Sequence, residues 1–220
     1  MQRLKVLGLA FVAVFAVSAV AVASASAAPV WKLNGAELTT ATTILSESGV
    51  VGKPTEKGKL TLTDIEAGTS IECAGKAEGK VGPGNKDEVT SMEATGCNFV
   101  TGKNGSCEAS KPVTAKAVAL PWVTELYEPE TGRVRDHIRA HSGGGAPGWT
   151  VECTVSGIFK VQDTCTGESN TAMNNVTGGV EAVFDAKTPK GNCTIGGAGA
   201  GEVKGASLNK NPAGGTLTVG

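Results

Sequence analysis

The stretch Ile71-Glu72-Cys73-Ala74-Gly75-Lys76-Ala77-Glu78-Gly79-Lys80-Val81 decides the fold class of this chain. Its odd-numbered positions are apolar or small, and most of the residues between them are charged. Side chains alternate between the two faces of a β-strand, so the pattern predicts one strand of a half-buried sheet. The segment 59–64, with Leu60 and Leu62 on one face, predicts a second such strand.

The rest of the chain favours the same kind of structure. Thr and Val are frequent, Leu is rare, and Gly or Pro interrupts almost every window of ten residues. Further strands are predicted at 88–94, 113–127, 133–141, 149–155, 159–163, 179–184, 201–208 and 216–219. Short strands joined by Gly-rich turns predict an all-β fold, either an antiparallel sandwich or a barrel-like arrangement.

One hairpin can be predicted down to its register. The loop 128–132 joins two alternating runs and sets Tyr127 opposite Arg133. Trp122 then lies opposite Ile138 on the apolar face, while acidic and basic side chains meet on the other face.

The first 27 residues predict a secretory signal peptide. Arg3 and Lys5 form its basic start, an apolar run covers 6–22, and Ala25 and Ala27 supply an A-x-A cleavage site. We therefore expect a secreted or cell-wall-associated protein. An uncleaved anchor helix is the alternative, because the apolar run almost reaches the length that spans a bilayer.

Cleavage after Ala27 leaves 193 of the 220 residues, which we expect to form a single β-rich domain at 28–220. The Gly-rich segment 142–148 is the place where this domain would divide into two halves. The remaining 18 basic and 21 acidic side chains give no basic excess, so nucleic acid is not an expected partner. No membrane contact is expected after cleavage. The expected partner is a polymer of the cell wall or extracellular space, and the oligomeric state stays open.

All six cysteines follow the predicted signal peptide: Cys73, Cys97, Cys107, Cys153, Cys165 and Cys193. An even number of cysteines in an exported chain predicts three disulfides. Leu, Ile, Val and Phe make up only about 19% of residues 28–220, which is close to the composition of disordered chains. Such a small apolar content gives a small hydrophobic core, so we expect the disulfides to supply part of the stability of the fold.

Spacing suggests how the cysteines pair. Cys97 and Cys107 flank a short Gly-containing segment, so a bridge between them is the first choice. A hairpin at 156–158 sets Cys153 opposite Val161, which leaves Cys165 about 13 Å away at strand rise. Cys153 and Cys165 are therefore expected to bond to the two remaining cysteines.

Four basic side chains share one face of the predicted strand 133–141: Arg133, Arg135, His137 and Arg139. This face is the candidate contact for an anion or a glycan, and the alternative is a solvated face paired with acids such as Glu125. On a helix, the spacing of His137 and His141 would place both on one side of a metal. On a strand they share a face with the arginines, which repel a cation. No metal, cofactor or catalytic residue is therefore assigned.

The cysteine-centred segments of the chain carry a resemblance. They are Ile71-Glu72-Cys73, Gly96-Cys97, Cys107, Leu120-Pro121-Trp122, Val151-Glu152-Cys153, Asp163-Thr164-Cys165 and the Gly-rich end around Cys193. With them the chain resembles uncharacterised secreted, cysteine-containing β-rich proteins of soil actinobacteria. The resemblance implies an exported, disulfide-stapled β-fold and supplies no catalytic residue.

These observations predict an extracellular or cell-wall-associated β-domain with a binding or structural role. The alternative is a secreted hydrolase acting on polysaccharide, because 21 acidic side chains offer many carboxylate pairs.

Overall fold

The computed structural model describes residues 28–102, 107–185, 192–194 and 199–220, and the predicted signal peptide lies outside them. Every regular element in these ranges is a β-strand, and all the pairings between strands are antiparallel. The all-β prediction is confirmed. The described residues include no helix that could span a membrane.

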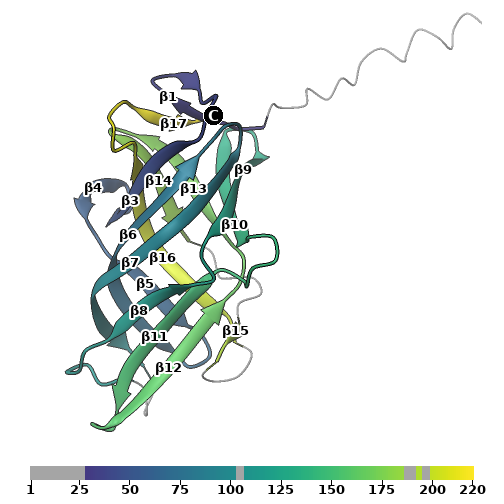
Figure 1. Cartoon of the computed structure of the whole chain (residues 1–220). Helices are drawn as coiled ribbons and strands as arrows, with labels where there is room; N and C mark the ends of the chain where they lie inside the picture. The colour runs from purple at the N-terminus through teal and green to yellow at the C-terminus, as the bar shows by residue number, and fades with distance from the viewer. Residues whose placement is uncertain (1–27, 103–106, 186–191, 195–198) are drawn as a thin grey trace, which may run out of the picture.

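Eight strands pair edge to edge into a closed, barrel-like ring. The order around the ring is β3, β6, β7, β9, β10, β13, β14, β16 and back to β3. Figure 1 shows this ring in the upper part of the molecule. Its strands are β3 (Thr42–Val50), β6 (Thr69–Val81), β7 (Lys86–Thr101), β9 (Trp122–Glu130), β10 (Arg133–Ala140), β13 (Ser169–Val176), β14 (Gly179–Phe184) and β16 (Gly201–Lys210).

A second, incomplete ring uses three of the same strands. Its order is β16-β5-β6-β7-β8-β11-β12-β15. The added strands are β5 (Leu60–Asp64), β8 (Thr114–Val118), β11 (Gly148–Val155), β12 (Phe159–Thr166) and β15 (Asn192–Cys193), while β4 (Lys53–Lys57) pairs with β3. The segment 142–148 connects β10 to β11 and so leads from the first ring into the second. Each ring therefore contains strands from both sides of that segment.

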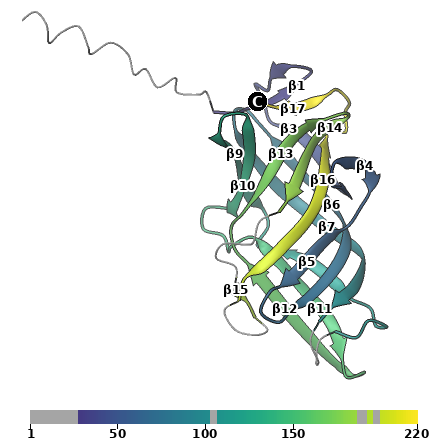
Figure 2. The ribbon, with the colours of Figure 1, turned by 180° about the vertical axis from the view of Figure 1, so that it is seen from behind.

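A small sheet covers one end of the first ring. It consists of β1 (Trp31–Leu33), β2 (Ala36–Glu37) and β17 (Leu217–Val219), and both views of the ribbon place it at the upper end (Figures 1 and 2). Trp31 and Leu217 are at most 1% exposed. They pack with Leu126 and Val180 in the apolar core of the first ring.

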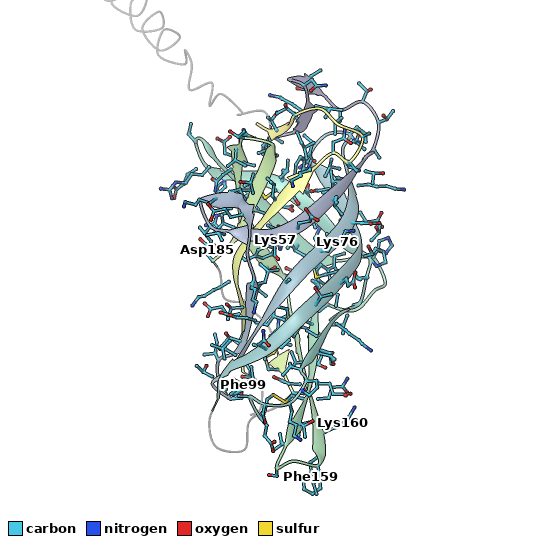
Figure 3. All side chains as sticks on the ribbon, turned by 90° about the vertical axis from the view of Figure 1, so that its left-hand side faces the viewer. Lys57, Lys76, Phe99, Phe159, Lys160 and Asp185 are labelled. Atoms are coloured by element: carbon cyan, nitrogen blue, oxygen red, sulfur yellow. A yellow bond between two sulfur atoms is a disulfide. The ribbon has the colours of Figure 1, made fainter. Side chains whose placement is uncertain are left out.

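The second ring has its own core. Ile71 of β6, Val113 and Val151 pack there together with four of the cysteines. At its far end the β11–β12 hairpin projects beyond the rest of the molecule, with Phe159 62% exposed at its tip (Figure 3). The turn of this hairpin has positive φ at Ser156 and Gly157.

The three disulfides are Cys73–Cys97, Cys107–Cys153 and Cys165–Cys193. The predicted Cys97–Cys107 bridge is wrong, because β7 continues to Thr101 and holds Cys97 beside β6. Cys107 instead lies beside β11, where Glu108 N–H donates to the Thr154 carbonyl oxygen. Cys153 lies opposite Val161 as predicted, and Cys165 bonds to Cys193. The expectation that Cys153 bonds to Cys73 or Cys193 is wrong.

The predicted β9–β10 hairpin forms, but its register differs by two residues. Arg135 lies opposite Tyr127 and Ala140 lies opposite Trp122, with an irregularity between Arg133 and Arg135. The turn is tighter than predicted, because Gly132 adopts a φ of 80° and Glu130 then pairs directly with Arg133. A shift of two preserves the faces, so Trp122 and Ile138 still both lie inside.

The predicted strand 113–127 is two strands, and several other strands were not predicted. The chain bends at Ala119, which has a φ of 58°, and Pro121 has no N–H to donate to a sheet. β8 therefore joins the second ring and β9 the first. The missed strands β3 and β13 are rich in Ser, Thr and Asn, so they lack a clear apolar alternation.

We expect a non-reducing peptide map to recover Cys107 linked to Cys153. Removing this bridge with the double variant Cys107→Ala, Cys153→Ala should lower the free energy of unfolding by about 2–5 kcal/mol in urea titration, because it frees a loop of 46 residues in the unfolded chain. The single variant Cys107→Ala should already lose most of that amount. A map that links Cys97 to Cys107 would contradict the arrangement.

Candidate functional site

The predicted basic face lies on the outside of β10, and each of its four basic side chains has a carboxylate partner. Arg133 pairs with Glu130 at 3.2 Å, Arg135 with Asp185 at 3.7 Å and His137 with Glu168 at 3.2 Å, while Arg139 contacts Glu125. These exposed or half-exposed pairs contribute little to stability. An anionic polymer would have to compete with them, so the anion or glycan contact stays a prediction.

The alternation that turns these side chains outward turns Asp136 inward. Asp136 lies between Arg135 and His137 and is only 8% exposed. Neighbouring residues of a strand face opposite sides, so an inward carboxylate could have been predicted from the basic face itself. Only the outward, charged positions of this strand were assigned from the sequence, so Asp136 was missed.

Asp136 belongs to a group of polar residues on four adjacent strands, although in the β9–β10 register it lies opposite Leu126. In the register, Asp87 of β7 lies opposite Thr124 of β9, and Asp136 of β10 lies opposite Thr171 of β13. Thr124 and Thr171 are at most 3% exposed. Long-range pairing therefore brings Asp87 and Asp136, which are 49 residues apart, to the same inner wall of the first ring.

The two carboxyl groups share an environment that disfavours their charge. Burial raises the pKa of Asp136 to about 7, although hydrogen bonds from the Thr124 hydroxyl and the Glu125 N–H act to lower it. Burial also raises the pKa of Asp87 well above its usual range, and the charge of Asp136 adds to this effect. The indole Nε1 of Trp31 donates a hydrogen bond to Asp87 Oδ2 at 3.1 Å, and this bond partly opposes the rise in the pKa of Asp87.

One oxygen of each carboxyl group has no hydrogen-bond partner among the described residues. Both are Oδ1 atoms, and both are fully buried. A buried acceptor without a donor is costly, and most buried polar atoms in proteins are paired. Asp87 and Asp136 thus leave two buried acceptors without a donor.

These carboxylates line a cavity of about 80 Å³. Thr124, Thr171 and Asn209 contribute further polar groups to its wall. A second cavity of about 100 Å³ lies between the two rings and is lined mostly by apolar side chains, among them Leu60 and Trp149. Four residues line both cavities: Met92, Trp122, Ile138 and Phe184. The interior therefore has an acidic part beside an apolar part.

A separate cluster near β15 offers less chemistry. Oxygen and sulfur atoms of Asp64, Asp163, Cys165 and Cys193 all lie within 4.8 Å of one another. Both cysteines are in a disulfide, so neither supplies a thiolate. Asp64 Oδ1 accepts the Ala67 N–H, while Asp64 Oδ2 is buried without a partner among the described residues. The Asp163 carboxylate accepts from Thr194. Two carboxylates are left, which is a small ligand set for a protein-bound metal.

The predicted alternative of a polysaccharide hydrolase needs two carboxylates that flank a polymer in an open cleft. Asp87 and Asp136 line an interior cavity too small for a glycan chain. This pair gives the hydrolase no support, and the alternative stays a prediction.

Asp136→Asn should change how stability depends on pH. The pKa of Asp136 is higher in the folded state than the value of about 3.9 expected in the unfolded chain, so the folded state binds this proton more tightly. The protonated carboxyl favours folding most below about pH 4, and that contribution is lost as the pH rises through about 7.

Between pH 5 and pH 8, we expect the free energy of unfolding of the wild-type protein to fall further than that of Asp136→Asn. The difference should be on the order of a few kcal/mol in urea titration. The matched control is Asp185→Asn, which removes an exposed carboxylate and should follow the wild type. Equal pH slopes for wild type and Asp136→Asn would contradict the raised pKa.

Comparison with known proteins finds no matching family model, no matching curated protein and no matching solved structure. The function is therefore inferred from the geometry of the chain's own residues.

Proposed function

We propose that this protein acts outside the cytoplasm, released or held at the cell wall, as a binding domain whose ring interior holds a small molecule. Three disulfides join its six cysteines, which indicates an oxidising environment. The predicted signal peptide supports export. A polymer contact through the basic face of β10 would serve to localise the domain rather than to fill its interior.

The observation that carries this proposal is a pair of carboxyl groups that line the cavity, each with one buried oxygen that has no partner among the described residues. Burying them without a partner lowers the stability of the empty protein. Such local costs in a folded protein are characteristic of functional sites, because stability alone does not favour them. A ligand that donates hydrogen bonds to Asp87 and Asp136 would remove the cost.

The dimensions of the interior support a small ligand. Rings of about eight strands are either filled by side chains or hold one small molecule. The cavities of about 100 and 80 Å³ share four lining residues. An apolar cavity of about 150 Å³ is sufficient to bind benzene. A molecule with a single ring is therefore the appropriate size.

Binding can be measured with three single-ring probes of different charge: benzyl alcohol, benzylamine and benzoate. Trp122 and Trp149 line the larger cavity, so an occupant should change their fluorescence. We expect at least one probe to give a saturable fluorescence change and to raise the melting temperature.

Ala115→Leu supplies the specificity control. Ala115 is 7% exposed and lines the larger cavity, so the added side chain should occupy the space and weaken binding at least tenfold. The matched variant Ala109→Leu changes an exposed residue and should bind like the wild type. Failure of all three probes to bind the folded protein would overturn the proposed function.

A further inference from the structure

We infer that the ligand is a small organic cation, a primary amine on a compact apolar group, with its ammonium group between Asp87 and Asp136. This inference rests on the proposed function and names the chemical class of the ligand. The apolar group would lie toward the larger cavity, against Trp122 and Trp149.

The charge of the smaller cavity is the first argument. Among the described residues that line it there are acidic side chains but no Lys, Arg or His. The nearest cations of β10 point outward and are paired with other carboxylates. Within the described part of the chain, no lining cation therefore balances Asp87 and Asp136. A bound positive charge would balance them in a place where a second negative charge is disfavoured.

The hydrogen-bonding requirement is the second argument. Asp87 Oδ1 and Asp136 Oδ1 are two buried acceptors without donors. An ammonium group carries three N–H donors, whereas a hydroxyl carries one and a carboxylate carries none. Two donors would satisfy the two Oδ1 atoms, and the third could reach a Thr124 or Thr171 hydroxyl on the same wall. Hydrogen bonds between charged partners are also the stronger kind.

The apolar surroundings are the third argument, and they separate an amine from a metal ion. Ca²⁺ takes six to eight oxygen ligands. The wall of the smaller cavity carries side-chain oxygens, but it also contains the large apolar side chains Trp31, Met173 and Phe184. An inorganic ion would leave these apolar side chains without a contact, while an alkyl or aromatic group on the amine would cover them.

The boundary between the cavities can adapt to such a ligand. Met92 and Trp122 line both spaces. Methionine has three rotatable bonds and a polarizable sulfur atom, so it rearranges at low cost. Trp122 is held in place because its indole Nε1 donates to the Val118 carbonyl oxygen at 2.8 Å. Its ring is therefore a fixed surface on which an aromatic group can stack, close to the positive charge of the amine.

The test compares benzylamine with its neutral analogue benzyl alcohol by titration calorimetry at pH 8. The two probes differ mainly in the group that would meet Asp87 and Asp136. We expect benzylamine to bind the wild type at least tenfold more tightly than benzyl alcohol, and benzoate to show no binding.

The double variant Asp87→Asn, Asp136→Asn should reduce benzylamine binding to the level of benzyl alcohol and leave benzyl alcohol binding unchanged. Near-ultraviolet circular dichroism checks that the double variant is folded. If it is not, the single variant Asp87→Asn replaces it and should show an intermediate loss of benzylamine affinity. The control Asp185→Asn should bind benzylamine like the wild type.

Each other outcome overturns the inference in a recognisable way. If benzyl alcohol binds as tightly as benzylamine, the interior is a ligand site but the amine assignment is wrong. If Ca²⁺ alone binds and the double variant abolishes it, while benzylamine does not bind, the site is a metal site. If no probe binds the folded wild type, the carboxyl pair is only structural, and the proposed function fails with the inference.

Discussion

The antiparallel pairing of β6 with β7 is the interaction on which the rest of the structure depends. These are the two longest strands, and both rings contain them. Their ladder has three irregularities, between Ser70 and Ile71, Glu72 and Ala74, and Glu78 and Gly79. Bulges bend a strand and increase its twist, which allows one pair of strands to serve two rings. Gly79 is required at the third irregularity, because a Cβ there would collide with the Glu88 carbonyl oxygen.

Local patterns predicted many of the strands and two of the hairpins, but not the pairing between segments that are distant in the sequence. The alternation from Ile71 to Val81 and around Leu60 is confirmed as β6 and β5, and Ile138 of β10 lies inside as expected. Pairing between distant segments leaves no comparable local signal. Cys97 lies in a strand that continues past it, so its bridge partner depends on the β6–β7 register and not on the nearest cysteine. The hairpin register was wrong by two residues because the turn at Gly132 is tighter than the loop composition indicated.

The candidate site could be predicted only in part for the same reason. Alternation along β10 is sufficient to place Asp136 inside once its neighbours are outside. Nothing local indicates that Asp87 joins it, because Asp87 lies at the start of a strand in a segment with several charges. Their meeting requires β7 to pair with β9 and β9 with β10. The site is therefore a property of the ring topology and is absent from any short stretch of sequence.

The distribution of the disulfides and the buried acids suggests how a chain with few large apolar residues can carry such a site. Cys73 and Cys153 lie in the core of the second ring with their partners, while Asp87 and Asp136 lie in the first ring. A disulfide contributes typically about 2–4 kcal/mol, which is comparable with the cost of one buried, partly paired carboxyl group. Since β6, β7 and β16 run through both rings, stability gained in one ring is transmitted to the other through continuous strands. The covalent bridges of the second ring can thus offset the cost of the partly paired carboxyl groups of the first ring without occupying its interior.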